Sequence, residues 1–475
     1  MRMFEQISLH LKSAHFRPRL MSQGTSSDPT SNTPVVRRMS LKRMRVLLLG
    51  MVLIAPVLRA ETREPLKAGC RVAIIGDSIT EQRLYSNYIE TYLLACCPEL
   101  KAVVFQFGWS GETAAGFEKR MANDMAWYKP THATICFGMN DGRYSRLTPE
   151  LEMTFQAALQ RILATLKKNG TFAVVGGPGA VDTKSYRPRG DSSVDARVYN
   201  ETLRRLSDVS SSLATESGFQ FAYLHQTMKE SMARAKQARG IDYLVCGADG
   251  VHPSPNGHLI MAYAFLKALG VTGDIGTIRM SMRDGRATAT NGHRILSSAA
   301  GRVELESARY PYCFTDLLRY PQSPTNRASD PFGVATILPF IPFNQELNRL
   351  VLQVDGLAWE KAKVSWGNQS KIFSKKELEA GVNLAAEFID DSPFAEAFNR
   401  VQRAVAIKQE FETLLVKSWL TRVPALEKLP GEDVLARKSV SATTTRLMDT
   451  WESLREAAPS RVAPVKHAIL IEEAR

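Results

Sequence analysis

Two short segments far apart in the chain hold side chains that together could carry out nucleophilic acyl transfer. Ser78 follows an apolar run, Val72–Ile75, which stops at Gly76. Far downstream, Asp249 and His252 stand close together. A serine hydroxyl is a weak nucleophile at neutral pH and needs a base within hydrogen-bond reach. A histidine held by an aspartate is such a base, because the carboxylate fixes the tautomer of the imidazole and stabilises its charged form.

Two further segments offer hydrogen-bond donors of the kind that acyl transfer requires. The reaction needs donors aimed at the oxyanion that forms on the carbonyl. The segment Gly108–Thr113 contains glycines, and a glycine can expose its backbone N–H because no Cβ blocks the approach. The segment Gly138–Asp141 contains an asparagine, whose amide offers N–H donors without a charge.

All of these polar segments stand next to predicted strands or helices. Apolar runs alternate with longer amphipathic stretches from Val72 to Gly270. We expect strands at 71–76, 102–107, 132–137, 171–176 and 219–224, and helices at 84–96, 113–127, 149–168, 195–217 and 255–269. This alternation predicts parallel pairing and a three-layer α/β sandwich. The carboxyl ends of parallel strands open on one edge of a sheet, so the polar segments should converge there.

The pattern changes after Gly270. Asp284-Gly285 and Asn291-Gly292 predict hairpin turns, and strand-like pieces follow at 301–305, 350–354 and 362–366. Ser374 and Glu377 match a capping box, while 394–419 and 443–457 have helical spacing. We therefore expect four parts: an N-terminal extension with a signal peptide (1–60), a catalytic α/β domain (61–270), a β-rich appendage (271–391) and a helical C-terminal region (392–475).

The charge distribution argues against nucleic-acid binding. The chain has a formal net charge of +13. Residues 1–60 hold ten Lys and Arg against two acids, so eight of these thirteen charges fall there. The mild excess that remains is spread over the rest of the chain without a basic stripe interleaved with aromatic residues. We expect no nucleic-acid partner.

The early positive charge precedes a short apolar run. Arg37, Arg38, Lys42, Arg43 and Arg45 come before Val46–Leu58, and Ala60 could end a cleavage site. This order is typical of a secretory signal peptide, and the run is shorter than the roughly 20 residues that a bilayer span needs. We expect an exported protein, periplasmic or secreted, with no stable membrane span after signal cleavage. The alternative is an uncleaved membrane anchor at 46–58, because Leu58 is bulky for a cleavage site.

The polar segments resemble, in this order, the motif blocks of the GDSL/SGNH hydrolase family of esterases and acylhydrolases. The blocks are Gly76-Asp77-Ser78, Ser110-Gly111, Gly138-Met139-Asn140-Asp141 and Asp249-Gly250-Val251-His252. The resemblance covers about 62–270 and implies the flavodoxin-like α/β/α sandwich of the SGNH hydrolase fold. It also implies Ser78 as nucleophile, His252 as general base and Asp249 as its orienting partner. The implied oxyanion donors are the backbone N–H groups of Ser78 and Gly111 and the side-chain amide of Asn140.

Residues next to these blocks are expected to shape the site rather than react. The candidate pocket-lining residues are Asp77, Trp109, Met139, Asp141, Arg143 and Tyr144. Asp77 is expected mainly to hold the turn, and Trp109, where the family often has a small residue nearby, would narrow the acyl pocket. Taken alone, Ser78 could instead cap the helix that follows it. The six cysteines have no metal-ligand spacing, so no metal, cofactor or disulfide is predicted.

These observations predict a serine esterase that cleaves small acyl esters, with acetylated carbohydrate as the expected substrate. The expectation of this substrate rests on the predicted export, the β-rich appendage and analogy with the family. Three alternatives stay open: a lipase or lysophospholipase with the same machinery, an O-acetyltransferase that passes the acyl group to a sugar, and a non-catalytic envelope-binding protein. The intact set of Ser, Gly, Asn, Asp and His speaks against the last.

Overall fold

The computed structural model describes residues 65–189, 191–315, 333–428 and 434–474. The apolar run 46–58, predicted as a signal peptide or membrane anchor, lies outside these residues, as does the whole predicted extension 1–60. Within the described ranges, no helix has the length and apolar character needed to cross a membrane.

A five-stranded parallel sheet forms the centre of the catalytic region. Its strands are β1 (Arg71–Gly76), β2 (Val103–Gly108), β3 (His132–Cys136), β4 (Phe172–Gly176) and β5 (Gln220–Ala222), in the order β2-β1-β3-β4-β5. Nearly all of their side chains are buried, as expected for a parallel sheet covered on both faces. The strand order reverses beside β1, so the ends of β1, β2 and β3 meet at a topological switch point, where open α/β sheets bind ligands.

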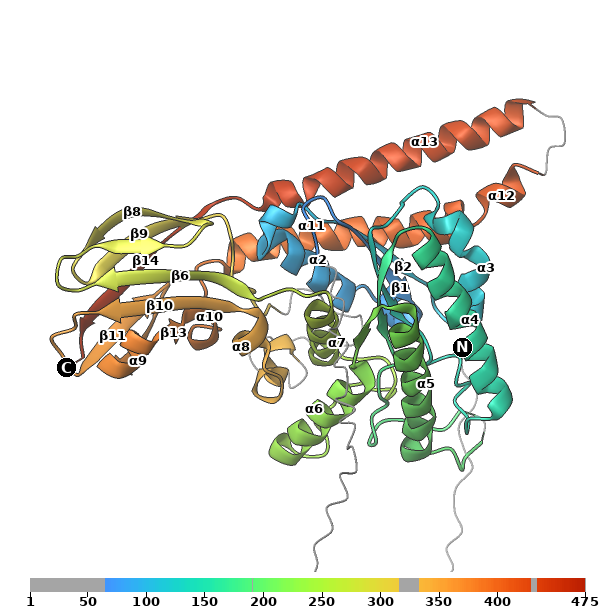
Figure 1. Cartoon of the computed structure of the whole chain (residues 1–475), viewed down its shortest axis with the longest axis horizontal. Coiled ribbons are helices and arrows are strands. Elements are labelled where there is room, and N and C mark those ends of the chain that lie inside the picture. The colour runs from blue at the N-terminus through green and yellow to red at the C-terminus, as the bar shows by residue number, and fades with distance from the viewer. Residues whose placement is uncertain (1–64, 190, 316–332, 429–433, 475) are drawn as a thin grey trace, which may run out of the picture. The chain divides into compact units, whose positions relative to one another are not determined.

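Helices cover both faces of this sheet, which confirms the predicted three-layer sandwich (Figure 1). One face carries α3 (Ala114–Met125), α4 (Pro149–Lys168) and α5 (Ala196–Ser217), and the other carries α2 (Tyr85–Ala95), α6 (Leu224–Arg239) and α7 (Pro255–Ala268). Thr148 caps α4 by accepting the Leu151 N–H, and Asp195 caps α5 in the same way. Helix α6 is absent from the sequence prediction, although Met228 and Met232 are buried at helical spacing.

Two further sheets form the β-rich appendage. One has the order β13-β10-β6-β7 and the other β12-β11-β14-β9-β8. Their strands are β6 (Asp274–Ser281), β7 (Ala287–Ala289), β8 (His293–Ala299), β9 (Arg302–Ser307), β10 (Arg349–Asp355), β11 (Lys361–Trp366), β12 (Gln369–Ser374), β13 (Val382–Asn383) and β14 (Val465–Glu473). Inward side chains of both sheets, such as Leu352 and Trp366, belong to one buried cluster. Prolines at both ends of 321–331 predict a loop there, and this range lies outside the described residues.

The two predicted hairpin turns have different outcomes. Asp284-Gly285 joins β6 to β7, which pair in antiparallel fashion. The hairpin prediction at Asn291-Gly292 is wrong, because β7 and β8 belong to different sheets. The buried His293 explains the switch: its ring nitrogens lie 2.8 Å from Ser307 Oγ and 3.0 Å from the Ile275 carbonyl oxygen, so it links the two sheets where β8 begins.

The C-terminal region is helical and then returns to the appendage. It comprises α11 (Ala395–Leu414), the π-helical turn η3 (Leu415–Leu420), α12 (Val423–Leu426), α13 (Val434–Ala457) and finally β14. In Figure 1, α11 and α13 run side by side. The sequence prediction for this region did not include β14, which pairs with β9 and β11. Its alternating buried residues, His467, Ile469 and Ile471, fit a strand with one covered face.

Short elements complete the described fold. They are η1 (Pro98–Leu100), η2 (Val334–Phe340), α8 (Phe343–Leu347), α9 (Lys375–Ala380), α10 (Leu384–Glu387) and η4 (Pro459–Arg461). The predicted capping box is present at the start of α9, where Ser374 and Glu377 each hydrogen-bond the backbone N–H of the other.

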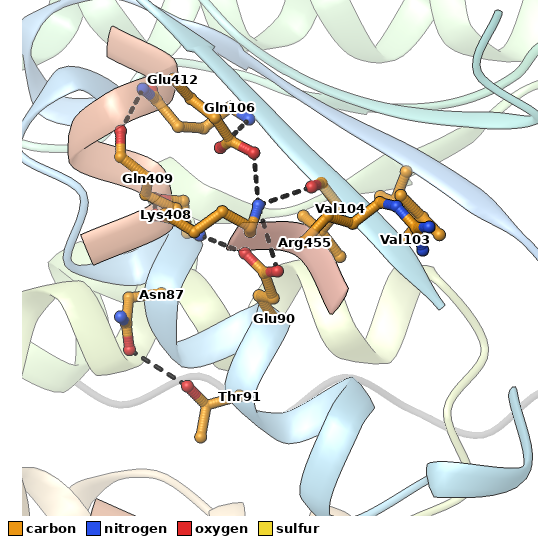
Figure 2. A network of polar contacts seen from close by, with 12 residues as sticks. Asn87, Glu90, Thr91, Val103, Val104, Gln106, Lys408, Gln409, Glu412 and Arg455 are labelled. Atoms are coloured by element: carbon orange, nitrogen blue, oxygen red, sulfur yellow. Dashed lines mark hydrogen bonds and ion pairs between the residues drawn. The ribbon is translucent and has the colours of Figure 1, made fainter. Parts of the chain in front are cut away.

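Helix α11 satisfies the open edge of β2 with buried charged side chains (Figure 2). Lys408 Nζ donates to the Val104 carbonyl at 2.8 Å and forms ion pairs with Glu412 and, at 3.2 Å, with Glu90. The other carboxylate oxygen of Glu412 accepts the Gln106 N–H at 3.2 Å. Val104 and Gln106 are β2 residues whose polar groups would otherwise face a missing neighbour strand. All three charged side chains are at most 4% exposed.

The environment of this network shifts the protonation of its members. Burial raises the pKa of Glu90 to about 7, although the Lys408 ammonium acts in the opposite direction. Burial also raises the pKa of Glu412. For Lys408, burial alone would lower the pKa, but the two carboxylates together raise it. The folded protein therefore keeps Lys408 charged and binds a proton on Glu90 more tightly than the unfolded chain does.

This shift predicts a pH-dependent contribution of Glu90 to stability. Its folded-state pKa is raised, so its contribution is present below about pH 4.5 and is lost as the pH rises towards 7. Glu90→Gln should remove that loss, with a difference in slope of up to about 1.4 kcal/mol per pH unit. Denaturant unfolding of the parent and of Glu90→Gln at pH 5, 6, 7 and 8 measures the pH dependence of the free energy of unfolding. Glu396→Gln, at an exposed carboxylate, is the control. Parallel pH curves for Glu90→Gln and the parent would refute the assignment.

Candidate active site

The serine of the first block stands at the start of a short helix, α1 (Ser78–Glu81). The cap of this helix is Asp77, whose Oδ1 accepts the Ile79 N–H at 3.0 Å, so Ser78 itself is not the capping residue. The helix lies directly on the strand ends, because a Cβ on Gly108 would come within 2.3 Å of the Glu81 backbone nitrogen. Glycine at this position therefore allows the close approach that places Ser78 at the carboxyl edge of the sheet.

Ser78, His252 and Asp249 form one hydrogen-bonded chain. Ser78 Oγ lies 2.9 Å from His252 Nε2, and His252 Nδ1 lies 2.7 Å from Asp249 Oδ2. The loop before α7 carries both His252 and Asp249, while Ser78 comes from the end of β1. The distances suit a base that accepts the serine proton and an aspartate that orients the base. The His252 side chain is 30% exposed, so the chain of groups is open to a substrate.

Hydrogen bonds keep Asp249 ionised. Burial alone would raise its pKa, but the His252 ring and the backbone N–H groups of Val251 and His252 donate to the carboxylate. Together they lower the pKa of Asp249 to about 2. Asp249 therefore carries its negative charge at every pH at which a histidine base works, and this charge favours a protonated imidazole beside it.

The second block forms a tight turn beside Ser78. The Trp109 N–H donates to the Gly76 carbonyl at 3.1 Å, and the Glu112 N–H donates to the Trp109 carbonyl at 3.1 Å. Gly111 occupies the third position of this turn with a φ of +76°, which a type II turn requires and which favours glycine. Gly111 is exposed, and a Cβ added there would meet no atom within 4 Å. The turn thus offers an open approach to its backbone.

The third block is fastened to the second. Asn140 Nδ2 donates to the Glu112 carbonyl at 3.0 Å. Asp141 accepts the Ala114 N–H with one oxygen and the Gly138 N–H with the other, each at 2.9 Å. An asparagine amide has two N–H donors, so Asn140 can keep this bond and still present a donor to a substrate. These bonds fix the position of Asn140 relative to the turn at Gly111.

Two buried carboxyl groups lie beneath the site. Burial raises the pKa of Asp77 to about 7, against the hydrogen bond from Ile79, and the nearby Asp141 adds to the rise. Burial likewise raises the pKa of Asp141 to about 6, against its hydrogen bonds from Ala114 and Gly138. Asp77 is 2% exposed and its Oδ1 accepts the Ile79 N–H, so it braces the turn that carries Ser78.

The other candidate pocket residues occupy different depths. Met139 is 2% exposed, which places it beneath the surface, and its carbonyl accepts the Tyr199 hydroxyl. Trp109 is partly buried between the guanidinium of Arg120 and the ammonium of Lys417. Arg143 is exposed and Tyr144 is half-buried. Both have left-handed backbone conformations, with φ of 51° and 54°, which bend the chain sharply after the third block.

Several residues near the site were not predicted from the sequence. The Arg189 guanidinium lies 4.2 Å from the centre of the Tyr144 ring and 3.6 Å from Asp249 Oδ2. Glu81 of α1 accepts the backbone N–H of Ser110, and Lys417 of η3 binds Glu81 and lies over the Trp109 ring. Only Glu81 had a sequence signal, its position one helical turn after Ser78. Arg189 and Lys417 lie in no motif, and their positions depend on the folded chain.

Comparisons with known proteins show which family the region around the candidate site resembles. Residues 74–260 match the model of the GDSL-like Lipase/Acylhydrolase family. An acetylxylan esterase of Geobacillus stearothermophilus is 23% identical over 224 residues, which cover 43% of this chain and 95% of the relative. The residues that match the family model lie within 62–270, where the sequence resembled this family. The comparisons confirm that resemblance and the expected enzyme class, a hydrolase of ester bonds.

A solved structure shares the fold over a longer range. BT4096, described as a gut microbial diltiazem-metabolizing enzyme, aligns with 87% of this chain and 100% of its own at 22% identity and a TM-score of 0.66. The shared fold therefore extends beyond the residues of the family match into the appendage and the C-terminal region.

The two carboxyl groups flanking the site predict opposite responses to amide substitution. Asp249→Asn should lower kcat for ester hydrolysis about 10⁴-fold, because an amide holds the wrong tautomer of His252 and cannot stabilise its charge. Asp77→Asn should keep kcat within about threefold, since an asparagine oxygen also caps a helix. Steady-state kinetics with nitrophenyl acetate compares them. Equal losses in both variants would contradict the separate roles.

The position of Asn140 predicts a loss in the chemical step. Asn140→Ala should lower kcat about 10²–10³-fold, as removal of one oxyanion donor does. Tyr144→Phe is the matched control, because it removes only the hydroxyl that lies 3.3 Å from Asn140 Oδ1. We expect the control to stay within about threefold of the parent. If kcat of Asn140→Ala equals kcat of Tyr144→Phe, Asn140 is not an oxyanion donor and serves only to connect the second and third blocks.

Proposed function

We propose that this chain, whose residues 74–260 form a GDSL-like lipase/acylhydrolase domain, is a serine esterase that removes small acyl groups from carbohydrates. The observation that carries the proposal is the hydrogen-bonded chain from Ser78 Oγ through His252 to Asp249. Acetyl is the acyl group we favour, because the curated relative over the catalytic region is an acetylxylan esterase.

The proposed reaction has two steps. His252 Nε2 takes the proton of Ser78 as Oγ attacks the ester carbonyl, and the oxyanion accepts N–H bonds from Ser78, Gly111 and Asn140. The carbonyl re-forms, the bond to the alcohol oxygen breaks, and His252 returns the proton to the leaving alcohol. Water, deprotonated by the same histidine, then attacks the acyl-serine; the bond from the acyl carbon to Oγ breaks, His252 returns the proton to Ser78 Oγ, and the carboxylic acid leaves. Asp249 keeps its charge throughout.

The open position of the site supports a bulky alcohol. The side chains of His252 and Asp249 are 30% and 43% exposed, so the leaving-group side of the ester can belong to a large molecule.

We also propose that the chain is exported, because basic residues precede the apolar run 46–58.

A series of esters tests the reaction and the acyl length together. Nitrophenyl acetate, butyrate and octanoate should be hydrolysed with kcat/KM falling as the acyl chain lengthens. Ser78→Ala should lower the rate about 10³-fold or more. Activity that survives Ser78→Ala would overturn the nucleophile, and a preference for octanoate would indicate a lipase.

Acetylated xylan tests the carbohydrate substrate. Free acetate should appear in proportion to the deacetylated polymer when the full chain is incubated with it. Acetylated sugar formed from an added acceptor, with little free acetate, would identify an acetyltransferase instead. Hydrolysis of nitrophenyl acetate without any release from the polymer would overturn the carbohydrate assignment but not the esterase.

A further inference from the structure

A lysine outside the family-matched residues reaches the turn that carries Gly111. Lys417 belongs to η3, and its Nζ lies 2.8 Å from Glu81 Oε1. The other oxygen of the Glu81 carboxylate accepts the backbone N–H of Ser110. Glu81 is the last residue of α1, the helix that begins with Ser78. One carboxylate thus connects the nucleophile helix, the turn of the second block and the C-terminal region.

The same C-terminal segment also contacts α3, the helix that follows the second block. The Asn123 side chain donates to the Leu420 carbonyl at 2.7 Å, and Thr421 Oγ1 lies 3.1 Å from Asp124. Asp124 forms an ion pair at 2.6 Å with Arg120.

Arg120 extends these contacts to the turn itself. It donates to the Phe107 carbonyl at 3.1 Å, forms an ion pair at 2.6 Å with Glu112, and stacks against the Trp109 ring. Lys417 Nζ lies 5.3 Å from the centre of the same ring. Residues on both sides of the turn are therefore tied to the segment from Lys417 to Thr421.

The geometry gives the Lys417–Glu81 pair an electrostatic role as well. The Glu81 carboxylate bonds the amide next to Gly111, so its negative charge lies close to the expected position of the oxyanion. A like charge there would oppose the negative charge that develops during acyl transfer. Lys417 compensates for it, and the side chains of the pair are only 29% and 19% exposed, so solvent screens the pair incompletely.

We propose that Lys417 is a positioning residue of the acyl-transfer site, which acts through Glu81 to fix the Ser110-Gly111 turn and to neutralise the carboxylate beside it. The catalytic part of this inference rests on the proposed esterase function. The C-terminal region thereby contributes to the oxyanion geometry, although it lies outside the residues that match the family.

Kinetics of four variants test the inference in the full-length chain. Lys417→Met should lower kcat for nitrophenyl acetate about 10-fold or more and leave KM within about twofold, since small displacements of catalytic groups affect mainly the chemical step. Lys417→Arg should restore kcat to within about threefold of the parent. Adding Glu81→Gln to Lys417→Met should recover part of the loss, because it removes the uncompensated charge. Lys371→Met, at an ion-paired lysine of the appendage, is the control and should leave kcat unchanged.

Amide hydrogen exchange supplies a measurement that does not need activity. Peptides that cover 108–113 should exchange faster in Lys417→Met than in the parent, whereas those of the control variant should not. If the parent shows no Ser78-dependent hydrolysis, the proposed function fails, and exchange alone decides whether Lys417 fixes the turn. An unchanged kcat in Lys417→Met would overturn the catalytic part, whatever the exchange shows. Unchanged exchange in that variant, or a double variant worse than Lys417→Met, would also overturn the inference.

Discussion

Among the residues that the structure describes, no strand pairs with the outer edge of β2, and the central sheet depends on how the polar groups of this edge are hydrogen-bonded. A bare edge would leave the Val104 carbonyl and the Gln106 N–H without partners inside the protein, where an unmade hydrogen bond is costly. Lys408 and Glu412 of α11 provide those partners from side chains. Burying them is itself unfavourable, and the cost is offset only because each charge has an opposite charge and further hydrogen bonds. Removing Lys408 would leave Glu90 and Glu412 buried without the opposite charge that they share.

The C-terminal helices therefore share one hydrophobic core with the parallel sheet. Trp451 of α13 packs against Phe105 and Tyr128, and Leu415 and Val416 join the same buried cluster as the strands β1 to β4. Successive turns of this helical segment have different contacts. The turns near Lys408 cover the edge of β2. The π-helical turn that follows places Lys417 beside Glu81, which binds the second block. A π-helical turn shifts the direction of the side chains that follow it, and such turns are frequent at functional sites. A chain cut at Gly270 would lose both contributions, so it would not isolate the catalytic function from the role of the appendage.

The sequence predicted what depends on local pattern. Apolar runs of strand length, separated by amphipathic stretches, gave the five strands and the three-layer sandwich, and the four polar segments lie at the edge where parallel strands must end. The contacts of α11 with the edge of β2 could not be predicted from such local patterns. Lys408 and Glu412 have the spacing of an ordinary solvent-exposed helical ion pair, and only contacts with residues some 300 positions earlier bury them. The strand β14 was missed for a similar reason, since a single strand after long helices finds its partners, β9 and β11, only in the folded chain. The positions of Arg189 and Lys417 beside the site follow from tertiary structure alone.

The three aspartates around Ser78 show how one small region can hold carboxyl groups in different states. Asp249 receives hydrogen bonds from His252 and two backbone amides, and its pKa falls to about 2. Asp77 and Asp141 are more deeply buried and their pKa values rise to about 7 and 6. The charged carboxylate therefore lies beside His252, the proposed base, while Asp77 and Asp141 retain protons more readily and add less negative charge near the proposed oxyanion site. The same logic applies to Glu81, which cannot be buried away from the turn that it holds and is compensated instead by a lysine. The raised pKa values of Asp77 and Asp141 and the pairing of Glu81 with Lys417 thus both limit the negative charge beside the proposed oxyanion site.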